Sequence, residues 1–159
     1  MEADYLDEDQ LLAALFGGPA RVLLIGRRAL VALGLPVLTA DYDIWVHIDD
    51  ISELNRSVAG LEIYPSCDPA EARRRGRYVL ENGEHIDVLV ARAVPTKDGE
   101  RVEFEEVWSR RTALDYGDQV RVCLPSIDDL IRTKKWSMRD RDVADIRLLE
   151  ALKKGRQES

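Results

Sequence analysis

The dipeptide Asn82-Gly83 is the feature of this sequence that most restricts its fold. It separates two runs of strand-forming residues, Arg77 to Glu81 and Glu84 to Ala91, and Asn-Gly between such runs is the strongest short-range signal for a β-hairpin. Apolar residues alternate in the second run, which places Asp87 on the face opposite to them. The middle of the chain is therefore predicted to form an antiparallel pair of strands.

Helices and strands are both expected on either side of this hairpin. An apolar run from Arg21 to Ile25 predicts a strand that ends at Gly26. A helix is expected over Arg27 to Leu33, because Gly34 suits the position after a helix end. The other expected elements are a helix that ends at Gly17, an alternating strand over residues 41–48, a helix capped by Asp49 or Asp50, a helix from Asp68-Pro69 to Gly76, a turn at Lys97 to Gly99, a helix around Phe104 to Trp108, and a second hairpin around Gly117-Asp118.

The last third of the chain is predicted to be mainly helical. Ser126 followed by Asp129 resembles a capping box and predicts the start of a helix. Asp140 is expected to cap a further helix. The predicted fold class is therefore α+β, with a mixed β-sheet, flanking helices and a C-terminal helical region.

The composition is that of one folded domain. The chain has 159 residues, and a domain has roughly 100–200, so we expect a single domain over residues 1–159 with a core at about 21–91 and a C-terminal extension at about 100–154. With 23 basic and 30 acidic residues the net charge is −7, so any contact with nucleic acid is expected to be local. The absence of a long apolar run or signal-peptide pattern favours a cytoplasmic protein with no membrane partner.

Carboxylates are placed where they could bind metal. Asp41 and Asp43 lie two residues apart on a predicted strand, so both project to the same side and can share hard cations through oxygen ligands. Asp87 would complete a site for two metal ions if its strand is a neighbour. An Asp-x-Asp tripeptide at a strand edge is, taken alone, more often a surface turn or a hydrogen-bond acceptor.

The order of these features resembles a known family. A strand that ends in Gly26, a following helix, Asp41-Tyr42-Asp43 and a third acidic residue on a later strand are similar to the minimal nucleotidyltransferases of the DNA polymerase β-like superfamily. The run from Leu130 to Lys134, continuing to Arg139, Asp142 and Asp145, looks like the tail of the subgroup related to the nucleotidyltransferase toxins of abortive-infection toxin–antitoxin systems. The resemblance spans roughly Val22 to Leu152.

This resemblance implies a nucleotidyltransferase-like fold and an enzymatic activity. The implied reaction moves a nucleoside monophosphate from a nucleoside triphosphate to a hydroxyl of a small molecule, a protein or an RNA end, with Mg²⁺ or Mn²⁺ as cofactor. It implies that Asp41, Asp43 and Asp87 bind the metal ions and that Asp87 is the catalytic residue that helps to deprotonate the acceptor. The implied nucleotide-binding residues are Gly26, Arg27, Thr39, Lys134 and Arg139.

Arg27 departs from the family pattern, which usually has Gly or Ser at this position. Its long side chain either swings away from the phosphates, obstructs them or supplies positive charge to them. The alternative interpretation is therefore a catalytically inactive nucleotidyltransferase-like binding module, with a cognate antitoxin or toxin as its partner. A metal-dependent phosphohydrolase is a third reading. Lys134 is expected either to bind nucleotide phosphate or to form a salt bridge with Asp142, Asp145 or a metal-site aspartate.

Overall fold

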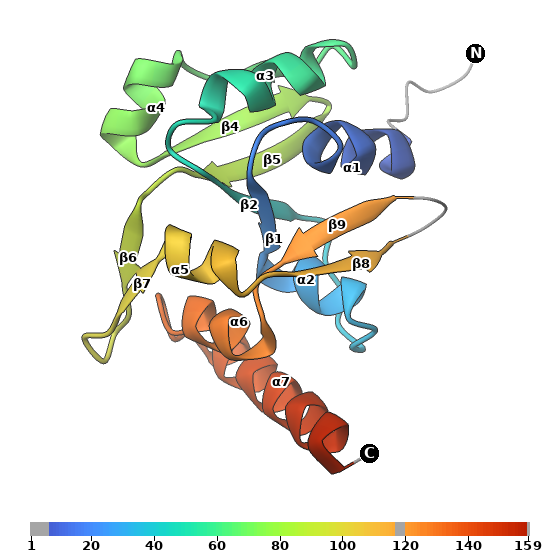
Figure 1. Ribbon diagram of the computed structural model, residues 1–159, viewed down its shortest axis with the longest axis vertical. Helices are drawn as coiled ribbons and strands as arrows, with labels where there is room; N and C mark the ends of the chain where they lie inside the picture. Colours follow the sequence, from blue (N-terminus) through green and yellow to red (C-terminus); the bar gives the residue numbers. More distant parts are fainter. Residues whose placement is uncertain (1–6, 117–119, 159) are drawn as a thin grey trace.

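A mixed five-stranded sheet forms the centre of the protein in the computed structural model, which describes residues 7–116 and 120–158 (Figure 1). The strand order is β1-β2-β5-β4-β3, and only β2 and β5 run parallel. The strands are β1 (Val22–Ile25), β2 (Tyr42–Val46), β3 (Tyr64–Pro65), β4 (Arg77–Asn82) and β5 (Glu84–Leu89). The hairpin expected at Asn82-Gly83 is confirmed as β4–β5.

Seven helices flank this sheet in the part of the chain that the structure describes. Those in the first half are α1 (Glu8–Phe16), α2 (Gly26–Ala32), α3 (Ile51–Ala59) and α4 (Pro69–Arg75), and those in the second half are α5 (Phe104–Ser109), α6 (Ile127–Lys134) and α7 (Asp140–Glu158). Figure 1 shows α3 and α4 beside β4 and β5, while α6 and α7 lie at the opposite end of the protein, below α2 and α5. None of these described helices is long and apolar enough to span a membrane.

Two small hairpins complete the fold. β6 (Ala93–Pro95) and β7 (Arg101–Glu103) pair across the turn expected at Lys97 to Gly99, although the sequence did not predict these strands themselves. β8 (Thr112–Asp115) and β9 (Arg121–Leu124) confirm the flanks of the second predicted hairpin. Its turn at Gly117-Asp118 lies outside the described residues.

The two faces of the sheet bury two separate apolar clusters. Ile44 and Val46 belong to the larger cluster, whereas Trp45 belongs to the smaller one, with Phe104 and Val107 of α5. The alternation in residues 41–48 places Trp45 and His47 on the same face as the aspartates. α5 covers this face at Trp45 and His47, which leaves Trp45 fully buried and His47 6% exposed.

The helix caps follow the sequence in some places and depart from it in others. Asp68 accepts the backbone N–H of Glu71, and Ser126 accepts that of Asp129, as predicted. Asp50 stands at the start of α3 but makes no capping bond with its side chain, because its carboxylate binds the side chain and backbone N–H of Arg21.

The expected cap at Asp140 is corrected in a similar way. Asp140 is the first residue of α7, and the carboxylate of Asp142, two residues later, accepts the backbone N–H of Arg139 at 2.9 Å. Asp142 therefore supplies the carboxylate that holds the first turn of α7. The sequence pattern alone does not show which of two neighbouring acidic residues caps such a helix.

Candidate active site

The parallel pairing of β2 with β5 brings two of the predicted carboxylates together. Asp43 lies directly opposite Asp87 in the register of these strands. Asp43 is partly buried and Asp87 is exposed. The condition that the two strands are neighbours is therefore met. Asp41, predicted to lie on the strand, lies one residue before β2 at the same end.

Burial and neighbouring charges both act on Asp43. Burial raises the pKa of Asp43, and the charges of Asp87 and Asp41 raise it further, while Lys134 and Arg141 lower it. Like charges have this effect on a carboxyl group when they lie close to it. Over residues 7–116 and 120–158, no three Asp, Glu, His or Cys side chains are grouped closely enough to hold a metal ion, so the metal set of Asp41, Asp43 and Asp87 stays a prediction.

The raised pKa of Asp43 gives a testable stability effect. A carboxyl group with a raised pKa in the folded state binds protons more strongly there than in the unfolded chain, so its ionisation destabilises the fold as pH rises above its unfolded value. We therefore expect Asp43→Asn to raise the melting temperature of the metal-free protein at pH 7.

Thermal melts in a chelator measure this shift, with Asp115→Asn as the control. Asp115 is an exposed aspartate on β8. Its ion pair with Arg121, at 3.8 Å, is exposed as well and contributes little to stability, so its replacement should leave the melting temperature nearly unchanged. A lower melting temperature for Asp43→Asn would contradict the prediction.

Gly26 lies against Asp43 at the end of β1. Its φ angle of +68° is one that residues with a side chain rarely adopt. A Cβ atom at this position would come within 2.7 Å of the Asp43 Oδ2 atom. Glycine is therefore required here both by the backbone turn and by the close approach of the aspartate.

Arg27 and Lys134 both form ion pairs with the carboxylate of Asp145 on α7. Arg27 Nε and Nη2 donate to the two carboxylate oxygens of Asp145 at 3.2 and 3.1 Å, and its Nη1 donates to the Leu38 carbonyl at 3.2 Å. Lys134 Nζ donates to Asp145 Oδ2 at 2.9 Å. Of the two expectations for Lys134, the structure therefore contains the salt bridge to Asp145.

Thr39 and Arg139 have different places in the structure. The Thr39 hydroxyl accepts the backbone N–H of Asp41 at 3.0 Å, so it fixes the segment before β2. Arg139 pairs with Asp142 at 3.1 Å, at the start of α7. Phosphate binding by either residue stays a prediction.

Two further residues contact the segments that carry the aspartates. His85 Nε2 lies 3.1 Å from Asp87 Oδ1. Arg28 donates to the backbone carbonyls of Thr39 and Asp41 at 3.2 and 3.3 Å. The alternation of β5 placed His85 and Asp87 on one face, but nothing in the sequence singled out Arg28, because its partners lie in a loop after its own helix.

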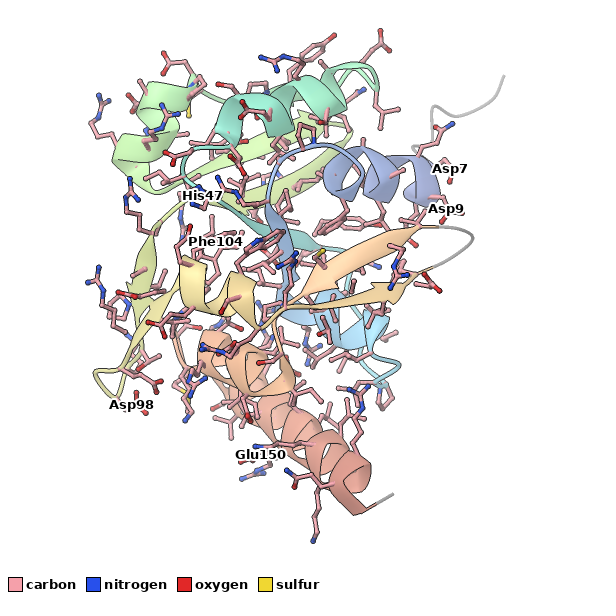
Figure 2. The ribbon with its side chains drawn as sticks, viewed as in Figure 1. Asp7, Asp9, His47, Asp98, Phe104 and Glu150 are labelled. Atoms are coloured by element: carbon pink, nitrogen blue, oxygen red, sulfur yellow. The ribbon has the colours of Figure 1, made fainter. Side chains whose placement is uncertain are left out.

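A second cluster of polar groups lies at the other end of β2. His47 is hydrogen-bonded to Glu105 of α5, and its ring meets Phe104 edge-on at 5.3 Å (Figure 2). Residues around this pair line a pocket of about 200 Å³. Neither Asp43 nor Asp87 lines this pocket, so it is distinct from the carboxylate pair.

Two solved structures share the fold of this chain. The crystal structure of TM1012 from Thermotoga maritima, an inferred nucleotidyltransferase, matches with a TM-score of 0.57 at 13% sequence identity, over 94% of this chain and 90% of that one. The solution structure of the antibiotic-resistance factor ANT(2'')-Ia matches with a TM-score of 0.58 at 17% identity, over 89% of this chain and 79% of that one. No protein-family model and no curated protein sequence is a significant match.

These similarities establish the fold. The mixed five-stranded sheet, its flanking helices and the C-terminal helices form a nucleotidyltransferase fold, as predicted. At such low identities they do not carry over the activity of either protein.

Proposed function

We propose that this protein is a metal-dependent nucleotidyltransferase that moves a nucleoside monophosphate from a nucleoside triphosphate to a hydroxyl group, with pyrophosphate as the leaving group. The acceptor is a small molecule, a protein or the end of an RNA. One observation carries the proposal: within a nucleotidyltransferase fold, the register of β2 and β5 sets Asp43 beside Asp87, next to the sharp turn at Gly26.

The residues at this place suit a divalent cation. Asp41, Asp43 and Asp87 offer carboxylate oxygens, which are the ligands that Mg²⁺ and Mn²⁺ prefer. The charges of the other two aspartates raise the pKa of Asp43, so positive charge is in deficit there. When bound, the metal supplies charge neutralisation for the triphosphate and acidifies the acceptor hydroxyl.

The remaining roles fall to side chains of this chain. Asp87 accepts the proton of the acceptor hydroxyl, and His85, 3.1 Å from its carboxylate, holds that carboxylate in orientation. Thr39 fixes the backbone ahead of Asp41 through its hydroxyl. Gly26, Arg27, Lys134 and Arg139 are the proposed contacts to the nucleotide.

Incubation with each radiolabelled nucleoside triphosphate tests the activity. We expect label to be transferred in the presence of Mg²⁺ or Mn²⁺, either to the protein itself or to added total RNA or small-molecule acceptors. A chelator should abolish the transfer. Failure of all four nucleotides with all three classes of acceptor would refute the proposal.

Metal binding has a separate thermal readout. A ligand that binds only the folded state raises its stability, by about 2.7 kcal/mol at a hundred times its dissociation constant. Millimolar Mg²⁺ or Mn²⁺ is therefore expected to raise the melting temperature by several degrees in the wild type and by much less in Asp43→Asn. An unchanged wild-type melting temperature would count against the metal site.

A binding module without catalysis is the second candidate. It is favoured by the engagement of both Arg27 and Lys134 with Asp145, since these are two of the three cations expected to contact the phosphates. In this case the chain binds a nucleotide or a partner protein, such as the other member of a toxin–antitoxin pair. Nucleotide binding without transfer of label would support this candidate over the first.

A further inference from the structure

Asp145 holds two cations inside the protein, where three helices meet. Arg27 comes from α2, Lys134 from the end of α6 and Asp145 from α7, and α2 packs against both of the other helices. The Asp145 side chain is fully buried, that of Lys134 is 7% exposed and that of Arg27 is 27% exposed. One carboxylate between two cations gives these three side chains a net charge of +1.

The hydrogen bonds to Asp145 are of the kind that phosphate groups receive. Arg27 gives two roughly parallel bonds at 3.1 and 3.2 Å, and Lys134 adds a third at 2.9 Å. A guanidinium matches a carboxylate and a phosphate equally well in this two-bond geometry, and an ammonium group adds a point charge to either. The Asp145 carboxylate therefore takes up the donors that a phosphate group would need.

The cluster also lies next to the candidate active site. Arg27 directly follows Gly26, where an added Cβ atom would come within 2.7 Å of Asp43 Oδ2. Lys134 is close enough for its charge to lower the pKa of Asp43. A polyphosphate bound beside Asp43 thus meets two cations that already have a partner.

We propose that Asp145 is an internal competitor for polyphosphate, an autoinhibitory contact that occupies Arg27 and Lys134 until a polyphosphate chain takes over their hydrogen bonds. This inference rests on the proposed function and adds a means of regulating it. A buried carboxylate without a cation is costly, so this exchange weakens the affinity of the wild type for polyphosphate.

The test is the affinity for inorganic tripolyphosphate, measured by calorimetric titration in a chelator without metal. Asp145→Asn keeps the shape of the side chain and removes the competing charge. We expect this variant to bind tripolyphosphate at least tenfold more tightly than the wild type. No gain in affinity in the folded variant, or no binding by either protein, would overturn the proposal.

Asp129→Asn is the matched control. Asp129 on α6 is also fully buried, receives two bonds from Arg110 at 2.9 and 3.1 Å, and a third from Arg132 at 2.7 Å. Its replacement removes a buried carboxylate from two cations at a cluster that is not next to Asp43, and these cations keep Glu106 and Glu100 as partners. We expect its affinity for tripolyphosphate to stay at the wild-type value, and an equal gain in both variants would also overturn the proposal.

Arg27→Gln provides the test if Asp145→Asn does not fold. This variant keeps the Lys134–Asp145 ion pair and removes one proposed phosphate donor, so binding should weaken at least fivefold, and unchanged affinity would overturn the proposal. These titrations need neither metal nor turnover. A protein that shows this pattern of affinities but transfers no nucleotide would refute the proposed enzymatic function and leave the role of Asp145 standing.

Discussion

Asp87→Asn is expected to lower the rate of nucleotidyl transfer by about a hundredfold or more. The substitution removes a proposed metal ligand and the proposed proton acceptor at once. Metal ions contribute several kcal/mol of transition-state stabilisation, and each 1.36 kcal/mol corresponds to a factor of ten in rate. The measurement is the initial rate of label transfer under saturating metal, with the wild type in parallel.

The same substitution should not destabilise the fold. Asp87 is exposed, and its charge raises the pKa of its neighbour Asp43, so removing it relieves repulsion. We expect a melting temperature equal to or above that of the wild type. A variant that loses activity only because it melts earlier would contradict the assigned role, and Asp115→Asn, which removes an exposed carboxylate on β8, should retain full activity.

Gly26→Ala is expected to damage both the fold and the activity. The new methyl group would need a left-handed backbone at φ +68° and would come within 2.7 Å of Asp43 Oδ2. A strained backbone of this kind costs on the order of 1–3 kcal/mol, and the contact would push the Asp43 carboxylate from its place opposite Asp87. We expect a loss of about 2 kcal/mol or more in the free energy of unfolding and at least a tenfold loss of transfer rate.

Gly34→Ala separates the two causes. Gly34 also has a positive φ, of +85°, but a Cβ there would meet no atom within 4 Å. Denaturant unfolding should show a loss of only about 1 kcal/mol for this variant, with transfer unaffected. Equal effects of the two substitutions would show that backbone strain, and not contact with Asp43, explains the requirement for glycine at position 26.

Much of the candidate site could be predicted because its signals are local. The alternation over residues 41–48 predicts the strand that carries Asp43, although Asp41 falls one residue before it, and glycine after a strand indicates a sharp turn. The hairpin at Asn82-Gly83 fixed the strand that carries Asp87, and the structure pairs that strand with β2. These features needed no knowledge of distant partners.

The partners of the long cations could not be predicted in the same way. Arg27 and Asp145 are 118 residues apart in the chain, and several acidic residues on the C-terminal helices were equally good candidates by type. Only the packing of α2 against α6 and α7 decides which of them meets Arg27. The same holds for Arg28, whose partners are backbone carbonyls with no signature in the sequence.

Trp45 and His47 illustrate the division most clearly. By itself, the sequence determined that residues in this stretch alternate between two faces, because the side-chain period of a strand is two. It did not determine what covers the second face. The tertiary structure places Phe104 of α5 against both side chains and buries this end of the face. Asp43, two residues before Trp45, stays at the partly open end beside Asp87. Local geometry thus fixed which residues share a face, and long-range packing decided which part of that face is core and which part is available for chemistry.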